Sequence, residues 1–369
     1  MFCAHVVGSM LRPKVLIEAR DSLHRGTVTE REFRAIEDEA VDRAIKVQED
    51  AGIELITDGE QRRFLFTDSF GSSVAGIELV TNDDPTEHIW HDDNGKEVKS
   101  ARPTVMPTIV GKLTRRRSVC EEEYRYAQRR AQRPVKVTLP SPTCAAIYWS
   151  QKHSTAAYPN ALAALRDVAE LLREEIAHLV SIGCKHVQLD APELTMAIDP
   201  KSIRLFESIG FDRRTFVSTA MELLDHVADR SPAELSIHMC RGNNQGLWHS
   251  KGGYDAISRE CFPHLRNFRY VLLEYDDARS GSFEALRDLP QSCCAVLGVV
   301  STKHSDIESF DALVERIDDA ARYFPRDQIG VSPQCGFASA IFGNPISFEA
   351  EASKLRIIGK LAKHLASAR

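Results

Sequence analysis

Short apolar runs alternate with longer segments of helical periodicity along most of the chain. The runs are rich in Val, Ile and Leu and are bounded by polar turn residues, a pattern typical of buried parallel strands. The predicted strands cover residues 4–9, 53–57, 135–139, 186–190, 234–240, 268–275, 295–301 and 328–335. The predicted helices cover residues 30–51, 160–182, 213–228, 254–261, 283–289, 307–323 and 347–366, with Thr29 as an N-cap and Asn160 opening the second helix.

The order of these elements predicts the architecture. Eight strands, mostly followed by helices, favour a closed (β/α)8 TIM barrel over an open sheet. A doubly wound sheet would need a glycine-rich phosphate-binding loop after its first strand, and Gly8-Ser9-Met10-Leu11-Arg12 is not such a loop. We therefore expect one barrel over residues 1–369.

One long segment, residues 64–133, interrupts the alternation. It contains two turn signals, Asn82-Asp83-Asp84-Pro85 and Asp92-Asp93-Asn94-Gly95, and the second is typical of a hairpin tip. A segment of this length inside a compact domain usually has a function or a small structure of its own. We expect a β-rich excursion, inserted after the second strand, that covers the mouth of the barrel.

Composition and charge narrow the class of partner. The net charge is −6 without a basic tail, which argues against nucleic acid and anionic membranes as partners. No signal peptide or membrane span is recognisable. Nine cysteines without regular spacing fit reduced thiols in a cytoplasm better than a disulfide framework. We expect a cytoplasmic protein that acts on small molecules, and the sequence leaves homo-oligomerisation open.

The most informative short motif is His238-Met239-Cys240, at the end of a predicted strand. Residues i and i+2 of a strand project from the same face, so the imidazole and the thiol converge. In such barrels reactive residues lie at the C-terminal ends of the strands, where Glu274 and Cys335 also fall. Other polar residues at strand ends are Ser9, Asp58, Glu60, Thr143, Asp190, Lys303 and His304.

One imidazole, two thiolates and one carboxylate suit a tetrahedral zinc ion, whereas thiolates disfavour magnesium and calcium. The predicted ligands are His238, Cys240, Glu274 and Cys335. Taken alone, Cys335 fits a buried thiol and Glu274 fits an ion pair equally well; the shared position at strand ends favours ligation.

A zinc ion with two thiolate ligands is too electron-rich to be a strong Lewis acid for hydrolysis. It is suited to binding a third thiol from a substrate, because coordination lowers the thiol pKa and the thiolate is the nucleophile. The carboxylate ligand is the one that an arriving sulfur could displace. The site therefore predicts attack of an activated thiol on an electrophilic carbon.

At this point the chain resembles a known family, the cobalamin-independent methionine synthases, and specifically short proteins equivalent to their catalytic C-terminal barrel. The resemblance covers nearly the whole sequence and depends on a series of motifs in a fixed order. These motifs are Gly8-Ser9-Met10-Leu11-Arg12-Pro13, Thr57-Asp58-Gly59-Glu60, Ser141-Pro142-Thr143 with Trp149-Ser150, Gln188-Leu189-Asp190-Ala191-Pro192, His238-Met239-Cys240-Arg241-Gly242-Asn243, Leu273-Glu274-Tyr275-Asp276 and Ser332-Pro333-Gln334-Cys335-Gly336.

The resemblance implies that zinc binds His238, Cys240, Glu274 and Cys335. It implies that Ser9, Glu60 and Asp190 hold the amino-acid part of homocysteine, with the two carboxylates facing the ammonium group. Trp149 falls where the family stacks the pterin of methyl-tetrahydrofolate; the alternative is a Trp packed in the barrel rim.

Three departures from the family pattern bear on specificity. The family's large N-terminal domain is absent, and its Asp-Glu-Pro motif is Asp190-Ala191-Pro192 here. Where the family places a proton-donating His after the seventh strand, this chain has Lys303, followed by His304. Adjacent strand residues face opposite ways, so only one of these two can serve as the catalytic acid with Asp190 nearby.

The leading functional hypothesis is zinc-dependent methyl transfer from methyl-tetrahydrofolate, or another methyl carrier, to homocysteine. The alternative is a transferase for a different thiol, such as coenzyme M or a glutathione-like thiol, acting on an epoxide or a methoxylated xenobiotic. The epoxyalkane:coenzyme M transferases are short relatives that use the same metal chemistry. A third hypothesis is a non-catalytic zinc-binding barrel, which would bind zinc without turnover.

Overall fold

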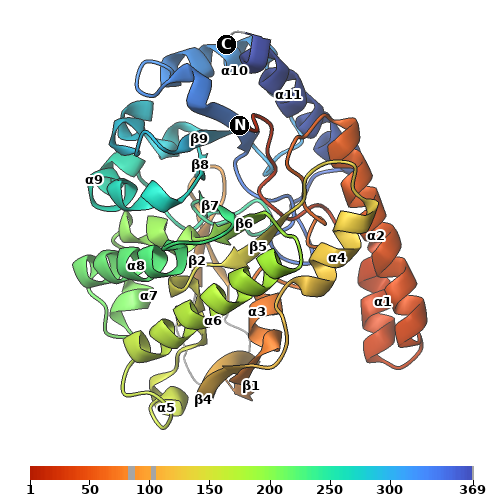
Figure 1. Cartoon of the computed structure of the whole chain (residues 1–369), viewed down its shortest axis with the longest axis vertical. Helices are drawn as coiled ribbons and strands as arrows, with labels where there is room; N and C mark the ends of the chain where they lie inside the picture. Colours follow the sequence, from red (N-terminus) through yellow and green to blue (C-terminus); the bar gives the residue numbers. More distant parts are fainter. Residues whose placement is uncertain (82–87, 101–104, 368–369) are drawn as a thin grey trace.

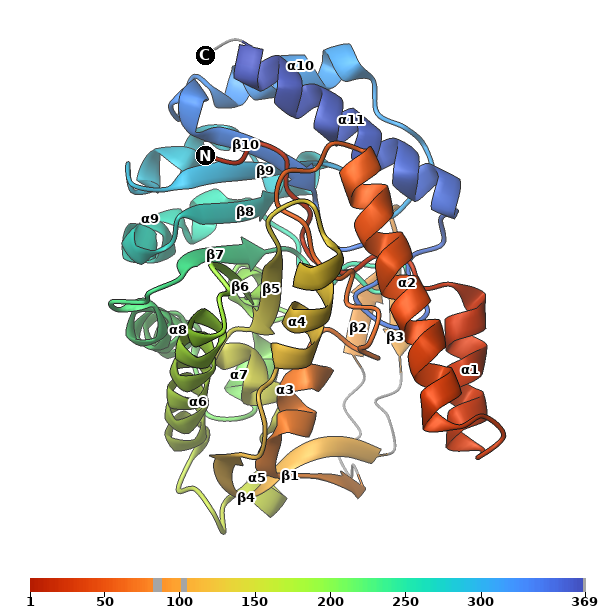
Figure 2. The same ribbon diagram turned by 45° about the vertical axis from the view of Figure 1, so that its right-hand side comes forward.

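The computed structural model describes residues 1–81, 88–100 and 105–367. Six parallel strands form its central sheet, in the order β10-β9-β8-β7-β6-β5. They are β5 Lys136–Pro140, β6 His186–Asp190, β7 Glu234–Met239, β8 Tyr270–Glu274, β9 Cys294–Val300 and β10 Ile329–Pro333. Figure 2 shows them one above another, with helices along the outside. Nearly every strand residue is buried: β8 and β9 are mainly apolar runs, whereas β5, β6 and β7 alternate apolar residues with buried polar ones such as Thr138, Gln188 and Ser236.

Two short segments stand where the first two strands were predicted. Ala4 bridges Val331 of β10, His5 bridges Leu55, and Ile56 bridges Val135, all in parallel orientation. The predicted strands 4–9 and 53–57 are therefore reduced to one or two bridges each. Side chains take the carbonyl groups that a longer ladder would use: Lys136 Nζ donates to Val6, Gln188 Nε2 to Val7 and Thr57 Oγ1 to Gly8.

Long helices cover the outside of the sheet (Figure 1). They are α1 Lys14–His24, α2 Glu30–Asp50, α6 Ala161–Ser181, α8 Arg213–Ala228, α10 Phe310–Ala320 and α11 Phe348–Ser367. Thr29 caps α2 with a complete capping box, and Asn160 caps α6 through the N–H of Ala163, so both predicted helix starts are confirmed. Helix α1 was not predicted.

Short helices occupy the connections. They are α5 Gln151–Ser154, α7 Arg204–Glu207, α9 Ser258–Cys261, and the 3-10 helices η1 Thr143–Tyr148, η2 Pro192–Ala197, η3 Tyr254–Ala256, η4 Phe262–Asn267, η5 Ala278–Ser280, η6 Phe283–Asp288 and η7 Arg326–Gln328. The predicted helices 254–261 and 283–289 are thus 3-10 turns with one short α-helical turn, too short to hold a regular apolar face. The helix predicted from residue 307 begins at Phe310, where Ser309 is the N-cap.

The excursion between the second bridge segment and β5 contains both helices and strands. Helix α3 Asp68–Ser73 leads into β1 Val74–Thr81, which pairs antiparallel with β4 Val105–Arg115. Strands β2 His88–His91 and β3 Glu97–Ser100 form a second antiparallel ribbon, and α4 Glu121–Arg130 follows. The β1–β4 ribbon lies at the end of the molecule farthest from the two termini (Figures 1 and 2).

The hairpin tip predicted at Asp92-Asp93-Asn94-Gly95 is confirmed. Asp92 accepts hydrogen bonds from Gly95 and Asn94, and Gly95 has a φ of 76° that favours glycine. The other predicted turn, Asn82-Asp83-Asp84-Pro85, lies outside the described residues. Within the described ranges, no helix combines the length and apolar content needed to span a membrane.

Candidate metal centre and active-site cavity

A buried cluster of one histidine and two cysteines lies at the C-terminal end of the sheet. The ligand-type atoms of His238, Cys240 and Cys335 all lie within 4.8 Å of one another. His238 and Cys240 project from the end of β7 and Cys335 follows β10, and each is at most 5% exposed. The i, i+2 geometry that the sequence predicted for the first two residues is what brings them together.

The electrostatics of the cluster favour a thiolate at Cys335. Hydrogen bonding to Cys240 and to the His238 ring holds the pKa of Cys335 well below its usual range, despite burial. Burial lowers the pKa of His238, but contact with Cys335 and nearby carboxylates raises it overall. A thiolate, a second thiol and an imidazole at this spacing form a donor set that fits zinc.

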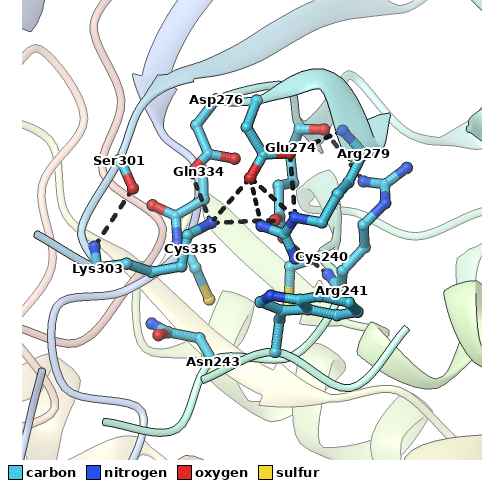
Figure 3. A network of polar contacts seen from close by, with 12 residues as sticks. Cys240, Arg241, Asn243, Glu274, Asp276, Arg279, Ser301, Lys303, Gln334 and Cys335 are labelled. Atoms are coloured by element: carbon cyan, nitrogen blue, oxygen red, sulfur yellow. Dashed lines mark hydrogen bonds and ion pairs between the residues drawn. The ribbon is translucent and has the colours of Figure 1, made fainter. Parts of the chain in front are cut away.

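Glu274, the fourth predicted ligand, is placed beside the cluster and has other partners (Figure 3). Its Oε2 accepts the backbone N–H of Arg241 at 2.7 Å. Its Oε1 lies 3.5 Å from both Lys303 Nζ and Arg279 Nη2. The structure thus brings together three of the four predicted ligands, and ligation by Glu274 stays a prediction.

The two predicted proton donors face different surroundings. Lys303 is 5% exposed, and its Nζ lies 2.6 Å from Asp276 Oδ2. Burial lowers the pKa of Lys303, but Glu274 and Asp276 raise it above its ordinary value. His304 is exposed. Lys303 is thus buried and His304 exposed, and neither residue lines the cavity described next.

A cavity of about 760 Å³ opens onto the cluster. One side, which we call the metal-side wall, is formed by residues at the strand ends: Ser9, Glu60, Asp190, His238, Cys240 and Cys335. The other side, the helical wall, is formed by residues of η1, η2 and α7 and their flanks: Cys144, Ala146, Ile147, Trp149, Glu193, Met196, Phe206 and Ile209. All four predicted substrate-binding residues, Ser9, Glu60, Trp149 and Asp190, therefore line one cavity.

Two carboxylates on the metal-side wall are held by hydrogen bonds from neighbouring buried side chains. Asp190 is opposite His238 in the β6–β7 register, and its Oδ1 accepts from Gln188 Nε2 at 2.7 Å. Burial raises the pKa of Asp190 to about 7. Glu60 Oε1 accepts from Thr138 Oγ1 at 2.7 Å, whereas its Oε2 has no hydrogen-bond partner among the described residues.

Close packing around the wall leaves no room for larger residues. A Cβ at Gly8 would lie 2.3 Å from Glu60 Oε1, and a Cβ at Gly336 would lie 2.1 Å from Ser9 Oγ. Ser9 Oγ also accepts the N–H of Ala338 at 3.3 Å. The glycine in the motif after Cys335 therefore lets the Ser9 hydroxyl approach the backbone at this end of the cavity.

Glu193 is a site residue that sequence reasoning did not single out. It is 4% exposed, and its Oε1 accepts hydrogen bonds from the hydroxyls of Ser141 and Thr143, the latter at 2.7 Å. Its Oε2 has no hydrogen-bond partner among the described residues. The only sequence signal was a carboxylate three residues after the end of a strand, which is too common to identify a site.

The β2–β3 ribbon also contributes to the cavity, through Trp90. Its neighbour His91 exchanges two backbone hydrogen bonds with Trp248, of 2.7 and 3.0 Å, and the two rings stack with centroids 4.4 Å apart. Trp248 Nε1 donates to the carbonyl of Asp92 at 2.9 Å. The ribbon is thus fastened to the loop that follows Cys240, a contact that the sequence did not predict.

Comparison with known proteins agrees with this geometry. A model of the cobalamin-independent synthase catalytic domain matches residues 2–344. The uncharacterized protein YxjH of Bacillus subtilis is 32% identical over 98% of this chain and 94% of its own length. The 5-methyltetrahydropteroyltriglutamate–homocysteine methyltransferase of Thermosynechococcus vestitus is 25% identical over 89% of this chain, which corresponds to 39% of that protein.

Solved structures show the same fold. A B12-independent methionine synthase from a Shewanella species, in complex with selenomethionine, superposes with a TM-score of 0.71 at 18% identity, covering 100% of this chain and 98% of that one. A methyltransferase from Methanosarcina mazei superposes with a TM-score of 0.55 at 11% identity, covering 99% and 94%. The chain belongs to the cobalamin-independent synthase catalytic-domain family of methyltransferases, as a short member with a buried His-Cys-Cys centre.

Proposed function

We propose that this protein is a zinc-dependent thiol methyltransferase that methylates homocysteine to methionine, with methyl-tetrahydrofolate or another methyl carrier as donor. The observation that carries the proposal is the His238–Cys240–Cys335 cluster, which opens onto the same cavity as two buried carboxylates. A zinc ion held there would lower the pKa of a substrate thiol and keep it ionised near neutral pH.

The residues of the metal-side wall have separate roles in this proposal. Glu60 and Asp190 face the ammonium group of the amino acid, and the Ser9 hydroxyl faces its carboxylate. These contacts point the substrate sulfur at the cluster. Glu274 would supply the fourth, exchangeable ligand. Once displaced by the substrate sulfur, its carboxylate would keep the Arg241 N–H, Lys303 and Arg279 as partners.

The helical wall suits the methyl donor. Trp149 offers a flat aromatic face for a heterocycle, and Ile147, Met196 and Phe206 exclude water from the reacting carbon. We also propose that the bridges at Ala4, His5, Leu55 and Ile56 complete a closed (β/α)8 barrel, with residues 64–133 inserted over its mouth. The insertion contributes Leu65, Phe66, Trp90, Met106 and Thr108, among others, to the lining of the cavity.

The first experiment is zinc analysis of the purified protein followed by X-ray absorption at the zinc edge, with and without homocysteine. We expect about one zinc per chain with two sulfur ligands, and a third sulfur after homocysteine is added. Formation of methionine from a methyl-pterin donor would then establish the reaction. A number of sulfur ligands on zinc that does not change when homocysteine is added would contradict the proposal.

The second candidate is a transferase acting on another thiol and a bulkier electrophile. The apolar helical wall is the observation that favours it, because Ile147, Met196 and Phe206 would also accept an epoxide or a methoxylated aromatic compound. This candidate would be selected if X-ray absorption shows a third sulfur ligand on zinc after coenzyme M or glutathione is added, but not after homocysteine is added. Zinc without any thiol response would favour a non-catalytic zinc protein.

A further inference from the structure

We propose that Glu193 is the catalytic acid that protonates the leaving group of the methyl donor. This inference rests on the proposed function and goes beyond it, because it assigns the proton to a residue on the helical wall. The predicted donors, Lys303 and His304, do not line the cavity. Lys303 Nζ is held by Asp276 at 2.6 Å, and His304 is exposed.

The reaction requires such an acid when the methyl group leaves from nitrogen. The thiolate sulfur attacks the methyl carbon, a C–S bond forms, and the C–N bond breaks with its electron pair remaining on nitrogen. An amine anion is a very poor leaving group in water, so a proton must reach that nitrogen in the same step. The proton that the substrate thiol loses on ionisation restores the acid for the next turnover, so the atoms balance without another reactant.

Glu193 has the geometry of a fixed donor. It is the second residue of η2, and the hydroxyls of Ser141 and Thr143 both donate to Oε1. This arrangement fixes the carboxyl group and leaves Oε2, which has no partner among the described residues, as the atom that carries a proton. Trp149 Nε1 on the same wall also lacks a partner among the described residues, so the helical wall has two buried polar atoms without a hydrogen bond.

The surroundings of Glu193 keep the carboxyl group protonated near neutral pH. Burial raises the pKa of Glu193 to about 7, against the opposing effect of the Ser141 and Thr143 hydroxyls. The titratable group in electrostatic contact with it is Cys144 on η1; of the other elements packed against η2, β7 carries Glu234 and His238. The buried side chains of α8, which packs against η2, carry no titratable group. A catalytic acid works best when its pKa lies near the working pH.

The other carboxylates of the cavity are less suited to this role. Glu60 and Asp190 are on the metal-side wall, where the ammonium group of the substrate would hold them ionised. His249, which also lines the cavity, has its Nδ1 bonded to Ser250 Oγ at 2.6 Å. Glu193 is the buried carboxyl group on the wall that faces the methyl donor.

The test compares two methyl donors in wild-type protein and in Glu193→Gln. With 5-methyltetrahydropteroyltriglutamate the leaving nitrogen needs a proton, whereas with methyl iodide the leaving iodide does not. We expect Glu193→Gln to lose about 100-fold or more in kcat with the pterin donor, as is usual for loss of a catalytic acid. Methionine formation from methyl iodide and homocysteine should slow by less than about threefold in the same comparison.

The pH profile gives an independent readout. Because the acid must be protonated, kcat of the wild-type protein with the pterin donor should fall as the pH rises through about 7. This fall should be absent from the residual activity of Glu193→Gln. Glu193→Asp, which restores a carboxyl group, should recover part of kcat and serves as the folding control if the Gln variant is unstable.

The outcomes separate the two proposals. Unchanged kcat in Glu193→Gln with the pterin donor, or an equal loss with both donors, would overturn the role of Glu193 alone. Wild-type protein that forms methionine from methyl iodide, but not from the pterin donor, would overturn the proposed donor together with this role. A zinc-edge spectrum of the wild-type protein that shows no added sulfur ligand with homocysteine would overturn the proposed function itself.

Discussion

The two walls of the cavity are built in different ways. The metal-side wall is formed by the ends of parallel strands, and its polar groups are held by partners inside the barrel, as Asp190 is by Gln188. The helical wall is formed by two 3-10 helices and the short helix α7, and most of its surface is apolar. In the proposed reaction the metal-side wall would bind and activate the thiol, and the helical wall, which is not part of the sheet, would bind the methyl donor.

The largest effect should follow from Cys335→Ser, which removes a thiolate from the metal-side wall. A serine hydroxyl is a poor zinc ligand at neutral pH, so zinc affinity should fall by more than about 100-fold and methionine formation should be lost. Zinc content after dialysis against a chelator measures the effect.

Cys144→Ser is the matched control for this change, because Cys144 lines the same cavity on the helical wall. It should keep one zinc per chain. Stoichiometric zinc in Cys335→Ser would show that Cys335 is not a zinc ligand. Loss of zinc in Cys144→Ser would show that the helical wall also contributes to the zinc site.

Asp190→Asn should produce the next largest effect, and only for the thiol substrate. The amide keeps the hydrogen bond from Gln188 but loses the charge that faces the ammonium group. Charged hydrogen bonds contribute about 1.5–3 kcal/mol, so kcat/KM for homocysteine should fall about 10–100-fold. The KM for the methyl donor, measured at saturating homocysteine, should not change. If the KM values for homocysteine and for the methyl donor rise together, the two walls do not bind the two substrates independently.

The same division explains how much the sequence predicted. The His238 and Cys240 pair follows from the two-residue period of a strand, and six of the eight strands were recognisable as apolar runs. The first two strands were predicted too long, because Lys136 and Gln188, distant in sequence, take the carbonyl groups of Val6 and Val7. Such long-range side-chain contacts leave no local pattern.

The helical wall was predicted far less well for the same reason. Trp149 was suggested only by the family resemblance, and Glu193 was not singled out at all. The position of Glu193 depends on Ser141 and Thr143, which lie on another connection, and on 3-10 helices that have no clear periodicity. The contact between His91 and Trp248 likewise joins the end of β2 to the loop after Cys240, and nothing in the local sequence specifies this pairing.

Trp149→Phe should affect the helical wall alone, by a smaller factor. The smaller ring loses stacking area and the unpartnered Nε1, so we expect KM for the pterin donor to rise about 2–10-fold. Zinc content and the response of the zinc edge to homocysteine should stay as in the wild-type protein. An unchanged KM for every donor tried would show that Trp149 packs in the barrel rim and does not contact the substrate.

The smallest effects should come from the β2–β3 ribbon, which has two kinds of contact with the barrel. Trp248→Leu removes the stacking on His91 and the hydrogen bond to Asp92, together about 1–2 kcal/mol. Lys201→Met removes an ion pair with Glu97 whose side chains are 59% and 42% exposed, so solvent screening leaves the pair little effect on stability. Amide hydrogen exchange in residues 88–99 should therefore increase in Trp248→Leu and stay nearly unchanged in Lys201→Met.

Because Trp90 lines the cavity, Trp248→Leu should also raise the KM for the methyl donor about twofold. Equal amide exchange rates in the two variants would show that the loop after Cys240 does not hold the ribbon. The ribbon would then not be a fixed part of the cavity beside the two walls.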